Sequence, residues 1–177
     1  MDAINWFMQD AMKHCEEFDH NAFRLQRLWN PFNDFIYQAN LNVMKSVYHK
    51  YCDHTNALKN RKNWDQADYD KFLRDVGVVN VYITEREPLL FFNLAMMTQI
   101  DELSSNRHLR MTFVEFLDVF ARIADRLTPT IDNPMSTLYQ KIAELIRIAA
   151  EKCLKMPDYK VIMPPLTLKE KIIDLSY

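Results

Sequence analysis

The chain has 177 residues, a formal net charge of −2 and a single glycine, whereas average usage would supply roughly a dozen glycines. Loops that hold dinucleotides or phosphates need clustered glycines, and hairpin-rich β-folds need turns that glycine mostly supplies, so the composition excludes both classes. The near balance of 22 Lys+Arg against 24 Asp+Glu predicts no general affinity for nucleic acid or for an anionic membrane surface.

The cysteines and the apolar runs give a further expectation. Cys15, Cys52 and Cys153 are widely separated and odd in number, which predicts a reducing compartment and no disulfide framework. No cationic stretch precedes an apolar run near residue 1, and the most apolar stretch, residues 88–97, is about half as long as a bilayer requires. We therefore expect a cytoplasmic protein without a membrane span.

The first third of the chain has helical periodicity. Apolar spacing predicts a helix over residues 4–18 and a short one over 22–29. Asn30 followed by Pro31 is typical of a helix start, with an N-cap before proline at the first helical position. An apolar stripe then predicts one long amphipathic helix of about six turns. The stripe contains Phe32, Phe35, Ile36, Ala39, Val43, Met44, Val47 and Tyr51.

The middle of the chain alternates between polar segments and helices. Residues 53–63 are polar and predict a loop, and a helix is expected over residues 65–76. Gly77 follows at the position where a left-handed conformation commonly ends a helix. Residues 78–83 are β-prone but short, so we expect an extended connector.

Two further helices are expected in this region. Residues 88–97 are apolar and helix-prone, after a capping-box pattern at residues 84–87. The pair Thr112 and Glu115 has capping-box spacing and predicts a helix that continues to about Leu127.

The last long helix is expected over residues 135–155, because Asn133 followed by Pro134 repeats the N-cap and proline pattern. Residues 156–177 contain prolines and are expected to run extended. Such a tail cannot bury itself, so we expect it to pack on the domain or on a partner.

The middle of the chain also contains a weak internal duplication across residues 41–128. In each unit a helix and a polar loop precede a second helix, which opens with an apolar residue, a cap, two residues and an acid. The apolar and acidic residues are Trp64 and Asp68 in the first unit and Met111 and Glu115 in the second. The duplication resembles a pair of EF-hands, in which the eighth loop residue is apolar and forms a short β-bridge and the twelfth is acidic.

The calcium-binding positions that this resemblance implies carry unsuitable residues. Calcium requires six to eight oxygen ligands, and the sixth loop position requires glycine, but Leu109 occupies that position in the second loop. The ligand positions are Ser104, Asn106, His108 and Arg110 in the second loop, and Ala57, Lys59 and Arg61 in the first. We therefore expect a degenerate EF-hand pair without a metal or cofactor, in which Asp68 and Glu115 serve as helix caps.

The expected fold class is all-α. N-terminal helices (residues 1–40) pack on the EF-hand-like pair (41–128), followed by a C-terminal helix (129–155) and a proline-broken tail (156–177).

The same layout is similar to EF-hand-like proteins of cilia and of the microtubule cytoskeleton, including the tubulin-polymerisation-promoting family. The similarity rests on the helix–loop start at Trp64, the Asp75–Gly77 turn and the second hand at residues 112–124. It implies a role at microtubules or in the ciliary axoneme, with tubulin or axonemal proteins as partners.

Two surfaces are candidates for partner binding. The basic cluster Lys59, Arg61 and Lys62, beside Trp64, suits the acidic tails of tubulin. In the tail, Pro164 and Pro165 lie in an apolar segment that we expect to bind a partner.

The function expected from the sequence is that of a non-catalytic structural or adaptor subunit in a larger intracellular assembly. His49, Cys52 and His54 lack the second ligand pair that structural zinc sites usually have, and no catalytic motif stands out. Two alternatives remain open: a calcium sensor with unconventional loops, and an accessory subunit of an enzyme complex.

Overall fold

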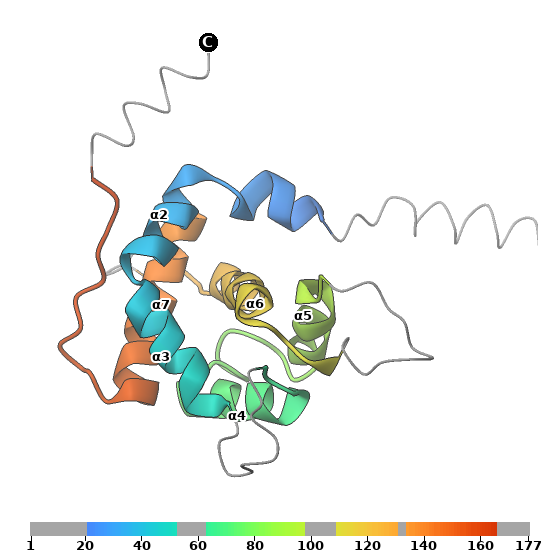
Figure 1. The fold of residues 1–177 in the computed structure, drawn as a ribbon. Helices are drawn as coiled ribbons and strands as arrows, with labels where there is room; N and C mark the ends of the chain where they lie inside the picture. The colour runs from blue at the N-terminus through green and yellow to red at the C-terminus, as the bar shows by residue number, and fades with distance from the viewer. Residues whose placement is uncertain (1–20, 53–62, 98–108, 131–133, 166–177) are drawn as a thin grey trace, which may run out of the picture.

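A computed structural model describes residues 21–52, 63–97, 109–130 and 134–165 of the chain. Within these ranges the secondary structure is helical and contains no strand, which confirms the all-α class for this part of the protein (Figure 1). The elements are the π-helical turn η1 (Arg24–Leu28), α2 (Pro31–Ala39), α3 (Leu41–Tyr51), α4 (Gln66–Val76), α5 (Glu87–Ala95), α6 (Phe113–Asp125) and α7 (Leu138–Leu154). The helix expected over residues 4–18 lies outside the described residues, as do residues 53–62 and 98–108 of the two polar loops.

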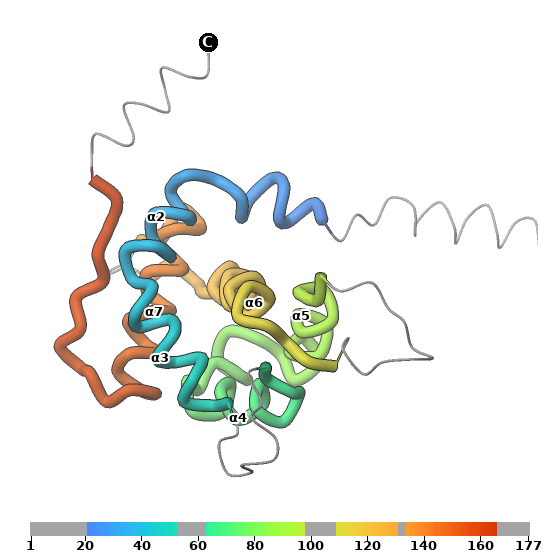
Figure 2. Tube along the Cα trace, viewed as in Figure 1, coloured from blue at the N-terminus to red at the C-terminus, as the bar shows by residue number. Residues whose placement is uncertain are grey.

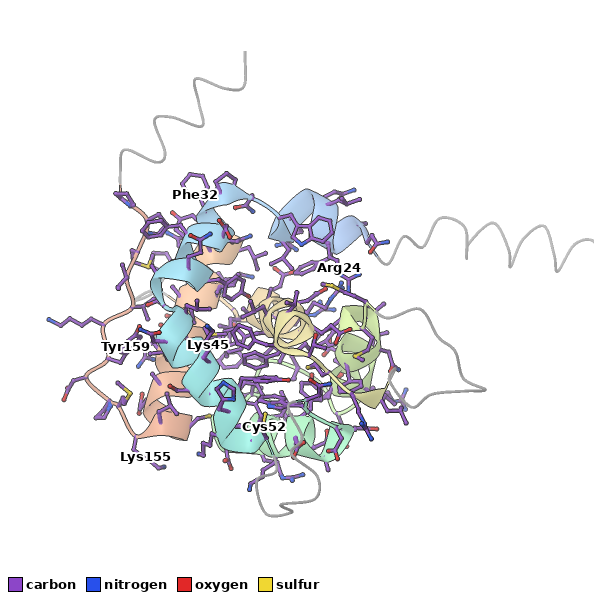
Figure 3. All side chains as sticks on the ribbon, viewed as in Figure 1. Arg24, Phe32, Lys45, Cys52, Lys155 and Tyr159 are labelled. Atoms are coloured by element: carbon purple, nitrogen blue, oxygen red, sulfur yellow. The ribbon has the colours of Figure 1, made fainter. Side chains whose placement is uncertain are left out.

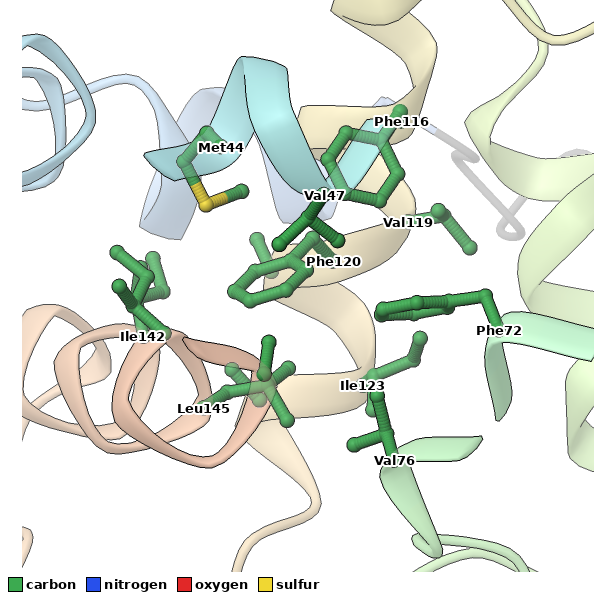
Figure 4. Close-up of a cluster of buried hydrophobic side chains, with 14 of the residues drawn as sticks. Met44, Val47, Phe72, Val76, Phe116, Val119, Phe120, Ile123, Ile142 and Leu145 are labelled. Carbon is green, nitrogen blue, oxygen red and sulfur yellow. The ribbon is translucent and has the colours of Figure 1, made fainter. Parts of the chain in front are cut away.

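Helix α6 is the central element. Figure 1 shows it almost end-on, with the other helices around it, and the tube in Figure 2 follows the same path. Helix α7 packs against α2, α3, α4 and α6, whereas α5 packs against α6 from another side. Figure 4 shows the resulting core, in which α3, α4, α6 and α7 each contribute apolar side chains. Those labelled are Met44, Val47, Phe72, Val76, Phe116, Val119, Phe120, Ile123, Ile142 and Leu145.

An aromatic cluster joins the starts of α4 and α6 to α3. The indole of Trp64 stacks on the ring of Tyr48, with centroids 5.2 Å apart, and lies 4.7 Å from the ring of Phe116. The indole N–H donates to the Tyr48 carbonyl at 2.7 Å. The backbones of Trp64 and Met111 form an isolated antiparallel bridge through two hydrogen bonds of 3.0 and 2.8 Å. The segments that lead into α4 and α6 are therefore held together.

Several helix boundaries follow the sequence patterns. The side chain of Asn30 accepts hydrogen bonds from the amides of Phe32 and Asn33, both at 3.1 Å, and caps α2 as expected. Gly77 ends α4 with φ 75°, in the left-handed region that glycine adopts without a steric penalty. Each of these signals involves only neighbouring residues.

The start of α7 differs from the expectation. Pro134 is not in the helix, which begins at Leu138 with Thr137 as its N-cap. The amide and the hydroxyl of Thr137 donate to Oε1 of Gln140 at 3.1 and 3.0 Å. This capping box satisfies the first turn one turn later than the proline pattern predicts.

The prediction of a single long helix from Phe32 to Tyr51 was also wrong. The chain forms α2 and α3, which are separated at Asn40 (φ −110°, ψ 19°). The carboxamide N–H of the buried Asn40 donates to the Ile36 carbonyl at 2.8 Å, and asparagine side chains compete with helical hydrogen bonds in this way. The apolar periodicity continues from α2 into α3, so the sequence pattern did not indicate a break between the two helices.

The same side chain holds the segment that follows α7. Residues 156–165, which we call the strap, form no helix and run beside α7 and α2 (Figures 1 and 2). The Asn40 carboxamide donates to the Ile162 carbonyl at 3.1 Å and accepts from the Ile162 amide at 3.0 Å and from the Tyr159 hydroxyl at 2.8 Å. Figure 3 shows Tyr159 on this segment, after Lys155 at the end of α7. The strap thus packs on the domain, one of the two outcomes expected for the tail.

Asn40→Ala should release the strap, because the three hydrogen bonds from its carboxamide to Tyr159 and Ile162 are lost together with the one to Ile36. We expect the free energy of unfolding to fall by about 1–3 kcal/mol and limited proteolysis within residues 156–165 to accelerate. The control is Asn42→Ala, which removes an exposed amide on α3. Equal strap cleavage in both variants would show that Asn40 does not retain the strap.

Candidate protein-binding cleft

A cleft of about 500 Å³ lies between the connection from η1 to α2 and the first turns of α6. Its lining is mainly apolar. The apolar residues that matter most are Leu28, Trp29, Met97, Val114 and Leu117. The acidic residues Asp34 and Asp118 also line it, and no lysine, arginine or histidine does.

Three of the lining side chains are unusually exposed for apolar residues. Trp29 is 60% exposed, Val114 is 59% exposed and Met97 is 44% exposed. A single exposed apolar side chain needs no explanation, but several around one concave site are typical of an interaction surface. The cleft was missed in the sequence, because its residues come from segments far apart in the chain.

A buried ionic cluster supports one wall of the cleft. Asp118 accepts hydrogen bonds from Nε of Arg24 and, at 2.7 Å, from Nε of Arg122. Arg24 also donates to the carbonyls of Leu94 and Ala95, both at 2.9 Å, at the C-terminal end of α5. A cation at this end of a helix is favourable because the last carbonyls lack partners. Arg24 therefore ties η1 to both α5 and α6.

One feature of the sequence indicates this cluster, although the apolar periodicity does not reveal it. Asp118 and Arg122 are four residues apart within an otherwise apolar stretch, and both side chains are buried. Buried charges require partners. Arg24 (Figure 3) could not be assigned as the second partner, because it is 94 residues away in the chain.

Tyr37 is a buried residue of the cleft lining. Its hydroxyl donates to the carbonyl of Leu117 at 2.8 Å and so ties α2 to α6. Burial, together with the nearby Asp118 carboxylate, raises the pKa of Tyr37 well above its ordinary value. The phenol therefore remains a hydrogen-bond donor throughout the physiological pH range.

The two acids at the twelfth EF-hand-like positions are both N3 residues of capping boxes. Asp68 pairs with Asp65 at the start of α4, and Glu115 pairs with Thr112 at the start of α6. Glu115 has an additional contact, because its Oε1 accepts from the amide of Met97 at 2.8 Å while Oε2 accepts from the Thr112 amide at 2.7 Å. One buried carboxylate thus joins the end of α5 to the beginning of α6.

Only some of the predicted partner-binding residues lie in the part of the chain that the structure describes. Trp64 is fully buried in the aromatic cluster, so its expected place in an exposed patch was wrong. Lys59, Arg61 and Lys62 lie outside the described residues. On the strap, Pro164 is partly buried and Pro165 is exposed.

Candidate metal ligands are likewise dispersed within the described ranges. No group of three or more His, Cys, Asp or Glu residues there is placed to hold a metal ion. Cys52 is buried, and its thiol donates to the Tyr48 carbonyl at 3.5 Å. Burial raises the pKa of Cys52, so its thiol remains protonated. His54 lies outside the described residues.

The chain matches no known protein family, no curated protein and no solved structure. Among the described helices, none combines the length and the apolar character of a membrane-spanning segment.

Calcium should leave the protein unchanged, because both oxygens of Glu115 already accept backbone hydrogen bonds. A ligand present at 100 times its Kd stabilises the folded state by about 2.7 kcal/mol. We expect no such change in thermal unfolding with about 1 mM calcium, where sites with a Kd of about 10 μM would be nearly full. Saturable heat in isothermal titration calorimetry would contradict this prediction.

Asp118→Asn should destabilise the fold strongly, because it leaves two buried guanidinium groups without their carboxylate. The expected loss in the free energy of unfolding is about 3–5 kcal/mol, measured by denaturant titration. The matched control is Glu151→Gln, at an exposed ion pair with Arg147, for which the expected loss is below about 1 kcal/mol. Similar losses in the two variants would mean that the cluster does not hold η1 to α5 and α6.

Proposed function

We propose that the chain is a non-catalytic adaptor subunit built on a degenerate EF-hand pair. The layout is supported by the antiparallel bridge between Trp64 and Met111, the two residues at the eighth loop positions of the sequence resemblance. The helix pairs would be α3 with α4 and α5 with α6. The capping boxes at Asp68 and Glu115 then fall at the twelfth positions.

In this proposal, hydrogen bonds to Glu115 replace the contacts that a calcium ion makes in an EF-hand. In an EF-hand the twelfth-position acid ligates calcium through both carboxylate oxygens. Here the two oxygens of Glu115 accept from the amides of Met97 and Thr112, so they close the second loop without a metal.

The position of α7 also favours a constitutive scaffold over a calcium sensor. Sensor EF-hand proteins open an apolar groove on binding calcium and accept a helix from their target there. In this chain α7 itself packs against α3, α4 and α6, and its buried side chains, such as Ile142 and Leu145, are part of the core. A groove of that kind is thus already filled by the chain's own helix.

The observation that carries the adaptor function is the apolar cleft with Trp29, Met97 and Val114 exposed around it. Its occupant is a protein segment with an apolar face and a lysine or arginine beside it. The basic residue follows from charge complementarity, because Asp34 is exposed at the cleft and no basic residue lines it.

The assembly in which this adaptor works is the microtubule or the ciliary axoneme. The support is the sequence resemblance, together with the basic residues Lys59, Arg61 and Lys62, which match the acidic tails of tubulin in charge. The cleft and the basic cluster would then contact different parts of the assembly.

Microtubule co-sedimentation of the full chain tests this function. We expect saturable pelleting with stabilised microtubules and weaker pelleting after proteolytic removal of the tubulin tails, because the basic cluster loses its acidic partner. Val114→Glu places a charge in the apolar cleft and should weaken binding at least about tenfold.

The control for that experiment is Val81→Glu, at a residue that is 66% exposed and does not line the cleft. It should bind as the unmodified chain does. If the chain stays in the supernatant at all microtubule concentrations, the microtubule assignment is wrong. If Val114→Glu binds normally, the cleft is not the binding surface.

A further inference from the structure

A groove of about 450 Å³ lies between helix α7 and the strap, and we call it the strap groove. One wall is a face of α7 that carries Ala143, Glu144 and Arg147. The other wall is the strap itself, chiefly through Val161 and Met163. The lining includes no residue of α2 or α3, and it shares no residue with the cleft beside α6. The two concave surfaces are therefore separate.

The hydrogen bonds at Ile162 show that the strap is extended at this residue. Its amide N–H and its carbonyl both bond to the carboxamide of Asn40, at 3.0 and 3.1 Å, so the two groups point in the same direction. A residue in an antiparallel β-strand has this geometry, because it exchanges both bonds with the residue opposite. Figure 2 shows a correspondingly extended path for the strap. The Asn40 side chain thus pairs with one edge of the strap as a neighbouring strand would.

The other edge of the strap has no hydrogen-bond partner among the described residues. In an extended chain the N–H and C=O groups of successive residues point to opposite edges, so those of Val161 and Met163 point away from Asn40. Neither residue forms a hydrogen bond in the described structure. Because Asn40 and its two helices do not line the strap groove, the edge that points away from Asn40 borders the groove. Pro165, which has no amide hydrogen, ends this edge.

We propose that the strap groove binds an extended segment of another protein, which adds to the strap as a second strand. The segment forms main-chain hydrogen bonds with the N–H and C=O groups of Val161 and Met163, while α7 forms the far wall. When a peptide adds to an exposed strand edge, main-chain hydrogen bonds supply affinity and alternate side chains supply specificity. The inference is independent of the microtubule assignment, because it concerns a different surface.

The side chains around the strap groove indicate the composition of the segment. Val161 and Met163 lie on one face of the strap, and residues opposite them share that face, so two apolar residues separated by one position fit best. Lys160 also lines the groove, is exposed and forms no ion pair in the described structure. Arg147 on the other wall is already paired with two glutamates. An aspartate or glutamate beside the apolar pair therefore complements Lys160.

Amide NMR of the isotope-labelled full chain tests the proposal with a defined probe, the capped peptide Glu-Val-Thr-Val-Thr. We expect saturable shifts of the amide resonances of Val161 and Met163, because their N–H groups become hydrogen-bonded. The matched control is the same peptide with N-methyl groups on its main-chain amides, which keeps the side chains and removes the donors. It should bind at least about tenfold more weakly.

Variants of the chain test whether the strap and its lysine form the site. Asn40→Ala should abolish the shifts, because the strap is no longer held beside α7, whereas Asn42→Ala should leave them unchanged. Lys160→Glu should weaken binding of the acidic probe about three- to tenfold. The matched control is Lys45→Glu, at an exposed residue of α3 that does not line the groove. Circular dichroism checks that each variant stays folded.

Four results would overturn the proposal. The first is the absence of shifts at Val161 and Met163 up to the solubility limit of the peptide. The second is equal binding of the N-methylated peptide, since main-chain pairing would then play no part. The third is a chain that is dimeric through this edge without peptide, because the occupant would be a second copy. The fourth is a peptide that binds only after residues 166–177 are deleted, because that segment would be the occupant.

Discussion

The near-complete burial of α6 is the constraint on which the rest of the structure depends. A helix enclosed on almost every side must find apolar neighbours for its apolar residues and partners for each of its polar ones. Helices α3, α5 and α7 pack against α6 and supply the apolar neighbours, together with Phe72 of α4, whose ring contacts those of Phe116 and Phe120. Arg24 supplies the polar partner, because Asp118 and Arg122 on α6 form a charge cluster that is complete only when η1 lies against the same helix. The site of the cleft follows from this, since the η1–α2 connection is fixed beside the first turns of α6.

The sequence predicted features that depend on residues close together in the chain. The cap at Asn30, the capping boxes of α4 and α6 and the end of α4 at Gly77 all involve partners within a few residues. The break at Asn40 was not predicted, because the apolar stripe is in phase on both sides of it and the decisive partner, Ile162, is distant. The cleft was missed for the same reason. Trp64 shows the reverse error, because its basic neighbours suggested a surface patch while its indole fills the core.

The hydrogen bonds that join the helices and the exposed apolar side chains lie in different parts of the molecule. The segments leading into α4 and α6 are joined by the Trp64–Met111 bridge, and the end of α5 is joined to α6 through Glu115 and through Arg24. The exposed apolar side chains of Trp29, Met97 and Val114 lie around the cleft beside this frame. A surface supported in this way is preorganised, so binding there would cost little conformational entropy.

The hydrogen bonds between Asn40 and the strap determine which amino-acid substitutions the strap tolerates. The carboxamide forms hydrogen bonds with the backbone amide and the backbone carbonyl of Ile162, and these bonds do not involve the Ile162 side chain. Ile162 itself is exposed. Most residues could therefore replace Ile162 without loosening the strap, whereas proline, which has no amide hydrogen, could not. At residue 162 the contact is specific for the path of the backbone, whereas at Tyr159 it depends on the side-chain hydroxyl.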